Sequence, residues 1–145
     1  IMSLKDGMKK MSKSDPSDLS RINLTDDNNQ IINKIKKAKT DPMTMPKDEK
    51  DLSERPEAEN LLGIYSSLQN QNIEKTLIEF GGKNFSEFKE KLSSLLVEKI
   101  SPISQEIKKL LDDKKYLDNV LLEGSQKADI IASKKIKEIK QLIGF

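Results

Sequence analysis

The chain has 145 residues, which suit one domain or one domain with part of another, and no apolar run approaches the length of a membrane span, so we expect a cytoplasmic protein without a membrane contact. Its 26 basic and 24 acidic residues give a net charge of +2, without the cationic excess of a protein that coats nucleic acid indiscriminately. The absence of histidine and cysteine excludes disulfides, His general bases, Ser–His pairs, and His or Cys metal ligands within this chain.

The first 25 residues are predicted to form short extended segments, turns and one loop. Because the first residue is Ile1 and not an initiator methionine, we expect the chain to begin inside a longer protein. Residues 1–4 are typical of the end of a strand, residues 5–7 of a turn, and residues 22–24 of another short extended stretch. We expect residues 1–25 to be loosely packed when the chain is isolated.

A lysine- and serine-rich loop follows the first turn, at Lys10-Met11-Ser12-Lys13-Ser14. Its two lysines are three residues apart, with two serines and little bulk between them. Such a loop can close on a polyphosphate, because lysines supply positive charge while hydroxyls and backbone amides supply donors. Most lysine-rich runs are only solvent-exposed surface, so composition alone does not choose between these two interpretations.

From Asp27 onward, apolar residues recur at helical spacing, with no strand-like alternation. Asp27 with Gln30 is a capping pair, and Gly81-Gly82 and Gly144 are end signals. The sequence therefore predicts an all-α, antiparallel bundle of about five or six helices whose apolar faces form the core. The expected elements are a helix from about 27 to 39, a loop over 40–55, helices over 56–68 and 72–80, a long helix from 84 that kinks or restarts at Pro102, and a last helix from about 113 to 144.

Two features of these helices carry further expectations. Gly124 and Ala128, in the middle of the last apolar face, predict a close approach to a neighbouring helix. The lysines at the end of the first helix indicate either a solvated face or a contact with a nucleic-acid backbone. These lysines are Lys34, Lys36, Lys37 and Lys39.

The loop motif resembles, letter for letter, the Lys-Met-Ser-Lys-Ser signature of class I aminoacyl-tRNA synthetases. Further blocks, in the same order along the chain, resemble the bacterial tryptophanyl-tRNA synthetases. These blocks are residues 2–4 with 9–16, 32–41, 55–65, 116–117 with 123–124 and 127–132, and 143–145. Together they extend over essentially the whole chain and are far more specific than the loop alone.

This resemblance implies an organisation and an activity for the intact enzyme. Residues 1–25 would be the end of a Rossmann-like catalytic domain, and residues 26–145 a helical tRNA anticodon-binding domain. L-tryptophan and ATP, accompanied by Mg²⁺, would give tryptophanyl-adenylate and pyrophosphate, and the aminoacyl group would pass to tRNA(Trp). The resemblance also implies a homodimer in the intact enzyme.

The resemblance assigns roles to the loop residues. Lys13 corresponds to the second signature lysine and would stabilise the leaving pyrophosphate. Lys10 corresponds to the first and would hold the loop on the phosphates, while Met11, Ser12 and Ser14 would complete the ATP-binding loop. We find no convincing set of metal ligands. Because the family's other signature, close to His-Ile-Gly-His, is missing, we expect the chain alone to be inactive.

Two alternatives stay open on the sequence. One is a fragment of a tyrosyl-type class I synthetase, the nearest neighbour of the tryptophanyl enzymes. The other is a non-catalytic helical interaction module that retains only a synthetase-like loop. The residues that would read an anticodon are not evident, because stacking platforms for bases are scarce in a chain with two tyrosines, four phenylalanines and no tryptophan.

Overall fold

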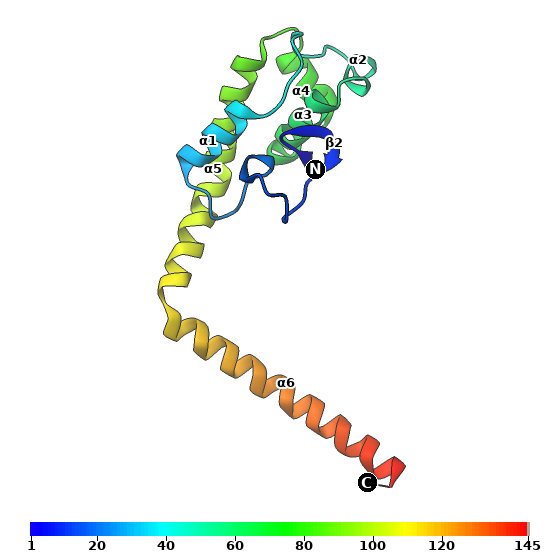
Figure 1. Ribbon diagram of the computed structural model, residues 1–145, viewed down its shortest axis with the longest axis vertical. Helices are drawn as coiled ribbons and strands as arrows, with labels where there is room; N and C mark the ends of the chain where they lie inside the picture. The colour runs from blue at the N-terminus through cyan, green and yellow to red at the C-terminus, as the bar shows by residue number, and fades with distance from the viewer. Residues whose placement is uncertain (145) are drawn as a thin grey trace. The chain divides into compact units, whose positions relative to one another are not determined.

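The computed structural model describes residues 1–144 and divides the chain into two compact units, Ile1–Gln105 and Glu106–Phe145. Six α-helices and one two-stranded sheet are present in the described part (Figure 1). The predicted all-α fold with a short non-helical start is confirmed. None of the helices within residues 1–144 has the length and apolar character that crossing a bilayer requires.

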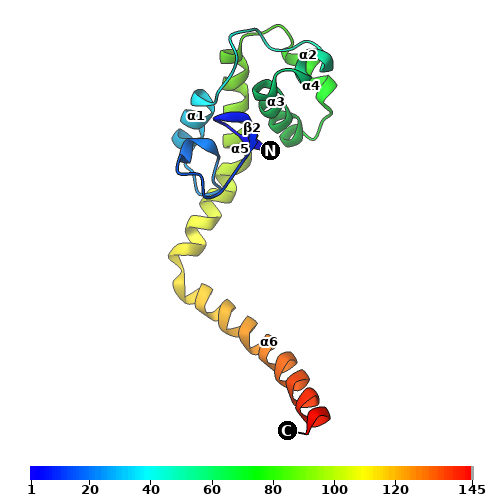
Figure 2. The ribbon, with the colours of Figure 1, turned by 45° about the vertical axis from the view of Figure 1, so that its right-hand side comes forward.

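The chain begins with an antiparallel hairpin of β1 (Met2–Ser3) and β2 (Asp6–Lys10), in which Met2 pairs with Lys10. The predicted strand near residues 1–4 is confirmed. The predicted turn over residues 5–7 is wrong, because the chain reverses at Leu4 and Lys5, and Asp6 already belongs to β2. No strand forms at residues 22–24. β2 lies against α3 (Pro56–Gln69), as two views agree (Figures 1 and 2).

The first helix, α1 (Asn28–Lys37), begins as predicted. The Asp27 carboxylate accepts a hydrogen bond from the Gln30 amide, and the Gln30 side chain accepts one from the Asp27 amide. Ile31 and Ile35 are fully buried on one face of the helix.

The segment between α1 and α3 is ordered more than the sequence indicated. It was expected to be a loop, yet it contains the short helix α2 (Glu49–Ser53), which begins at an Asp48 cap. The buried Met45 fixes this segment further, because its amide donates to the Lys83 carbonyl and its carbonyl accepts from the Gly82 amide. The prediction of an unstructured loop over the whole stretch is therefore wrong.

The core of the first unit is built by α1, α3, α4 (Ile73–Phe80) and the first part of α5 (Phe85–Asp112). Three aromatic rings meet in it: the Phe80 ring lies 4.9 Å from each of the Tyr65 and Phe88 rings, with edge-to-face geometry. Such pairs stabilise beyond the area that they bury. Leu92, Leu95 and Leu96 extend this core along α5.

Pro102 does not end α5, so the prediction of a restart there is wrong. A proline inside a helix leaves the carbonyl four residues earlier without its amide partner. That carbonyl belongs to Glu98, which is exposed, as is Pro102 itself. Water can therefore hydrogen-bond to the freed carbonyl, and the helix continues.

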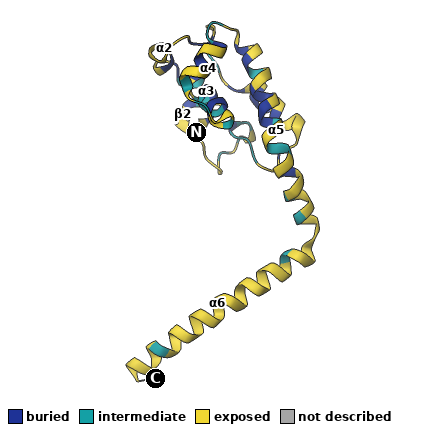
Figure 3. Cartoon of the chain, turned by 180° about the vertical axis from the view of Figure 1, so that it is seen from behind, coloured by how far each residue is buried: buried dark blue, intermediate teal, exposed yellow. Residues whose placement is uncertain are grey.

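The last helix, α6 (Lys114–Ile143), begins and ends as predicted. The Asp113 carboxylate accepts from the Tyr116 amide, and Gly144 ends the helix at a φ of 81°. However, α6 has no buried residue within its own unit, and its exposed surface is visible in Figure 3. No neighbouring atom lies within 4 Å of the position that a Cβ on Gly124 would take. Within this unit, α6 therefore shows neither the predicted core face nor the predicted close contact at Gly124, and Phe145 lies outside the described residues.

Candidate phosphate-binding loop

The signature loop, residues 10–14, is exposed at every position. Lys10 ends β2, which corrects the prediction that the whole motif is loop, and the next four residues leave the sheet. Within residues 1–144, neither Lys10 nor Lys13 forms an ion pair with a carboxylate, whereas Lys9 lies 3.7 Å from Asp6. The structure thus presents two cationic side chains on one short segment.

The loop serines contribute hydroxyl groups to the same surface. The Ser12 and Ser14 Oγ atoms lie 3.1 Å apart and share a hydrogen bond. Both hydroxyls are exposed and can turn toward a ligand. Two ammonium groups, two hydroxyls and the backbone amides between them form a donor set that suits a polyphosphate.

Met11 is the apolar member of the loop, and its side chain is 37% exposed. It lines a cavity of about 240 Å³ in the first unit, together with Leu4, Ile22 and Ile64. The lining is almost wholly apolar. Met11 therefore faces this apolar cavity, while Lys10 and Lys13 are exposed to solvent.

The start of the loop is anchored by contacts of the β1–β2 hairpin with α3. A Cβ on Gly7 would lie 2.5 Å from the Pro56 carbonyl carbon, so only glycine permits this approach of β2 to the helix. The Asn60 side chain accepts from the Met2 amide at 2.9 Å and donates to the Met2 carbonyl at 3.1 Å. These contacts fix the strand that leads into Lys10.

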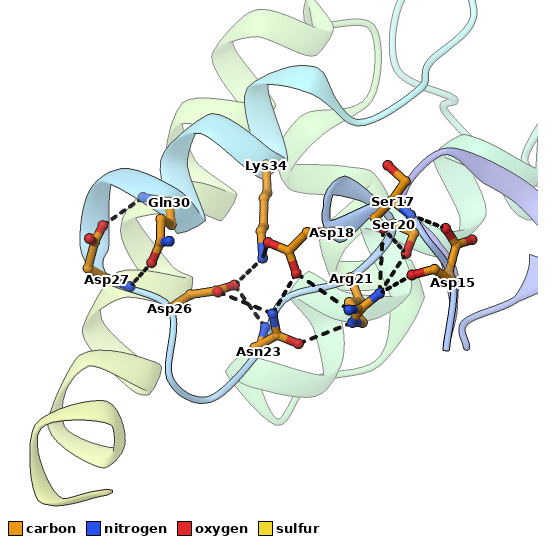
Figure 4. Close-up of polar contacts among 10 residues, drawn as sticks. All are labelled: Asp15, Ser17, Asp18, Ser20, Arg21, Asn23, Asp26, Asp27, Gln30 and Lys34. Carbon is orange, nitrogen blue, oxygen red and sulfur yellow. Dashed lines mark hydrogen bonds and ion pairs between the residues drawn. The ribbon is translucent and has the colours of Figure 1, made fainter. Parts of the chain in front are cut away.

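The end of the loop is anchored by Arg21 and Ser20 (Figure 4). Arg21 Nη1 donates to the Asp15 carbonyl at 3.1 Å. The Ser20 hydroxyl donates to the Ser17 carbonyl at 2.7 Å, and the Ser17 amide donates to the Asp15 carboxylate at 2.7 Å. The residues that directly follow Ser14 are thereby folded into a compact turn.

Lys34 of α1 joins this turn to the helix. Its Nζ lies 2.7 Å from Asp18 Oδ2 and 2.6 Å from Asp26 Oδ2, and its side chain is 3% exposed. The hydrogen bond from Lys34, followed by one from Asn23, holds the pKa of Asp18 below its usual value. The interpretation of Lys34 as part of a solvated face is therefore wrong.

The sequence contains a signal for this buried lysine. Ile31, Lys34, Ile35 and Ala38 follow the i, i+3, i+4, i+7 spacing of one helix face. A lysine on that face predicts a buried charge that needs acidic partners. Asp18 and Asp26 are the partners that the fold supplies.

The other lysines of this cluster differ from one another. Lys36 and Lys37 are exposed, as the solvated-face interpretation expected. Lys39 forms an ion pair of 2.8 Å with Glu57, and the hydrogen bond between them raises the pKa of Lys39 and lowers that of Glu57. Only part of the cluster is thus available for a nucleic-acid backbone.

Residues 1–144 contain no group of three or more Asp, Glu, His or Cys side chains that could hold a metal ion. The loop itself offers ammonium and hydroxyl groups, which do not form the oxygen-rich, anionic ligand set that Mg²⁺ prefers. Residues 1–144 therefore do not fit a protein-held Mg²⁺ site.

Comparison with protein families places this loop in a known context. The model of the family described as tRNA synthetases class I (W and Y) matches residues 1–101. The chain belongs to this family. Its match includes the hairpin, the signature loop and both anchors of the loop.

Curated relatives of this class I synthetase family match the chain from end to end. The chain is 52% identical over 145 residues to the tryptophan–tRNA ligase of Agrobacterium fabrum and 48% identical to that of Rickettsia felis. These matches cover 100% of this chain but 41% and 43% of the two relatives. The predicted resemblance to the bacterial tryptophanyl-tRNA synthetases is confirmed, and the chain spans less than half the length of these relatives.

A solved structure supports the fold. The tryptophanyl-tRNA synthetase from Mycoplasma pneumoniae superposes with a TM-score of 0.75 at 23% identity, over 100% of this chain and 43% of that one. The arrangement of hairpin, loop and helices is thus one that occurs in a class I synthetase.

Proposed function

We propose that the chain is the C-terminal part of a tryptophan–tRNA ligase. The observation that carries this proposal is the 52% identity over all 145 residues to a protein of that name, with the signature Lys-Met-Ser-Lys-Ser on an exposed, doubly anchored loop. The intact enzyme activates L-tryptophan with ATP and transfers it to tRNA(Trp). It acts in the cytoplasm as a homodimer.

The first step is an in-line displacement at phosphorus. A carboxylate oxygen of tryptophan forms a bond to the α-phosphorus of ATP, and the bond to the bridging oxygen of the leaving pyrophosphate breaks. Negative charge grows on that pyrophosphate in the transition state. A lysine that meets this charge stabilises the transition state more than the ground state.

Lys13 is the residue to which we assign this stabilisation. Its ammonium group is exposed and has no carboxylate partner within the described residues, so it is free to meet the leaving group. Lys10, at the end of β2, holds the loop on the phosphates. Ser12 and Ser14 donate to phosphate oxygens, and Met11 keeps the loop packed on the first unit.

ATP brings Mg²⁺ with it in this proposal. Because residues 1–144 contain no suitable group of ligands, we assign the ion no partner in this chain and no step. The residues that would bind tryptophan are also assigned to the part of the enzyme that the chain does not span.

The functional division that we propose lies near residue 25. Residues 1–25 complete the catalytic domain and carry the loop, whereas residues 26–145 bind the anticodon region of the tRNA. Exposed lysines support the second part of this proposal, since phosphate contacts require unpaired cations. Lys36 and Lys37 at the end of α1 are such residues.

Tryptophan-dependent exchange of pyrophosphate into ATP tests the proposal. The intact protein that carries this chain should catalyse the exchange with tryptophan and not with tyrosine, whereas the isolated chain should not catalyse it. Lys13→Ala should lower the rate about 100-fold or more, as expected for the loss of a charge that acts in the transition state. Lys5→Ala, at an exposed lysine of the same hairpin, is the matched control and should retain the rate.

The same assay decides between the alternatives. Exchange with tyrosine in place of tryptophan would identify a tyrosyl-type enzyme. An intact protein that binds tRNA but catalyses no exchange with either amino acid would identify a non-catalytic interaction module.

A further inference from the structure

The segment that follows the signature loop is held by one connected polar network. Asp15, Ser17 and Asp18 are linked through Arg21, since its Nη1 donates to the Asp15 and Ser17 carbonyls and its Nη2 lies 3.5 Å from Asp18. Arg21 Nε also donates to the Asn23 side chain. Figure 4 shows that these side chains converge on the region between the loop end and α1.

Lys34 is the residue of α1 that joins this network, and it connects the two acidic groups Asp18 and Asp26. Its Nζ is shared by Asp18, beside the loop end, and Asp26, just before α1. Asn23 also connects the two carboxylates. Its side-chain Nδ2 donates to Asp18 at 2.9 Å, and its backbone amide donates to Asp26 at 2.8 Å. A single buried cation thus joins the turn to the helix.

Lys34 and Asp26 form a buried ion pair, whereas Asp18, the other partner of Lys34, is exposed. The side chains of Lys34 and Asp26 are 3% and 5% exposed, whereas that of Asp18 is 57% exposed. Removing the cation would leave the buried Asp26 without its counter-charge, and Asp18 without its tie to α1. No other lysine of the described chain holds two carboxylates in this way.

We propose that Lys34 is a positioning residue for amino-acid activation, which holds the end of the signature loop against α1. This inference rests on the proposed function. With both anchors in place, the free segment is residues 11–14, between Lys10 in β2 and Asp15 in the turn. Fully extended, four residues reach about 14 Å. Because the segment is fixed at both ends, Lys13 can move only a short distance.

The expected effect follows from the length of the free segment. Without Lys34, the next fixed point is Ser20, which is fully buried and whose carbonyl accepts from the Leu4 amide at 2.9 Å. The free segment then becomes residues 11–19, about twice as long. The local concentration of a tethered group falls as about the −3/2 power of the length, which gives about a threefold loss. Lys13 would reach the pyrophosphate less often, while the tryptophan site would be unaffected.

The test compares Lys34→Met with Leu92→Ala. Leu92 is fully buried in α5, so its truncation destabilises the first unit without touching the network. In the intact protein, we expect Lys34→Met to lower kcat for tryptophan-dependent pyrophosphate exchange about threefold, with the KM for tryptophan within twofold of the unsubstituted value. We expect Leu92→Ala to change neither at a temperature where both variants are folded.

A second readout does not depend on activity. In the 145-residue chain, hydrogen exchange of the amides in residues 11–17 should be faster in Lys34→Met than in Leu92→Ala. If Lys34→Met does not fold, Asp18→Asn replaces it, because this exposed carboxylate can be changed without leaving a buried charge unpaired. For Asp18→Asn we then expect a smaller decrease in kcat and a smaller increase in the hydrogen exchange of residues 11–17.

The outcomes separate the two proposals. Equal kcat losses in Lys34→Met and Leu92→Ala, or unchanged exchange in residues 11–17, would overturn the positioning role. No tryptophan-dependent activity in the unsubstituted intact protein would overturn the proposed function. The hydrogen-exchange comparison would then still decide whether Lys34 anchors the loop.

Discussion

The guanidinium of Arg55 donates two hydrogen bonds to the carboxylate of Asp41, one of 3.0 Å from Nε and one of 2.7 Å from Nη2. Nη2 also donates to the Thr44 carbonyl at 2.8 Å, and the Arg55 side chain is 6% exposed. This fork joins the beginning of α3 to the segment that precedes α2. It explains why a stretch rich in proline and charge is nevertheless ordered.

We expect Arg55→Met to destabilise the protein by about 3 kcal/mol, because the partly buried Asp41 carboxylate and the Thr44 carbonyl lose their partner. The midpoint of urea unfolding, followed by circular dichroism, measures the change. Lys99→Met is the control, since its ion pair with Glu98 is exposed and should contribute less than about 1 kcal/mol. Similar small changes in both variants would contradict the structural role of Arg55.

Gly7→Ala should displace the strand that leads into the signature loop. The added Cβ would lie 2.5 to 2.6 Å from backbone atoms of Pro56 and Glu57, which cannot move without shifting the start of α3. We expect a loss of about 1–3 kcal/mol, as for overpacking. Gly63→Ala within α3 is the control, because nothing lies within 4 Å of its Cβ position, and it should stabilise by about 0.5–1 kcal/mol. A neutral Gly7→Ala would contradict the close approach.

Acidification should destabilise the protein through three carboxylates. Hydrogen bonds from Lys34 and Lys39 lower the pKa values of Asp18 and Glu57. At Asp41, burial raises the pKa, but the hydrogen bonds and charge of Arg55, together with the bond from the Met43 amide, lower it overall. As the pH falls, the unfolded chain therefore binds protons at a higher pH than the folded chain does. Its carboxylates titrate near their ordinary pKa values, 3.8 for Asp and 4.5 for Glu. The contribution is complete above about pH 5 and is lost as the pH falls through the folded pKa values.

Urea midpoints measured from pH 6 to pH 3 check this dependence. Glu57→Gln removes one of the three groups and should flatten the decline, since one proton fewer is taken up on unfolding. An equally steep decline in Glu57→Gln would exclude its ion pair with Lys39 as a source of the effect.

Local signals made much of this fold predictable. The Asp27–Gln30 cap and the helix end at Gly144 depend on residues within a few positions of one another, and the structure confirms both. The pairing of Met2 with Lys10 was missed because strand pairing depends on a partner elsewhere in the chain.

The candidate site was predictable only in part. The loop was found because its five residues match a family signature, not because their composition is distinctive. Its anchors were missed because they join residues far apart in sequence, such as Lys34 with Asp18 and Asn60 with Met2. A lysine on an apolar helix face indicates a buried charge, but the sequence does not say which of 24 acidic residues pairs with it.

The aromatic cluster should be the part of the core that is most sensitive to truncation. Phe88 is fully buried, and its ring centroid lies 4.9 Å from that of Phe80 and 5.9 Å from that of Tyr65. We expect Phe88→Ala to cost about 3–5 kcal/mol, because the cavity forms between three elements that cannot all close on it. Ile78→Ala is the matched control, since Ile78 lies on α4 beside this cluster but is 85% exposed. Its effect should stay within about 0.5 kcal/mol, and a comparable loss in the two variants would mean that this face of α4 is covered in solution.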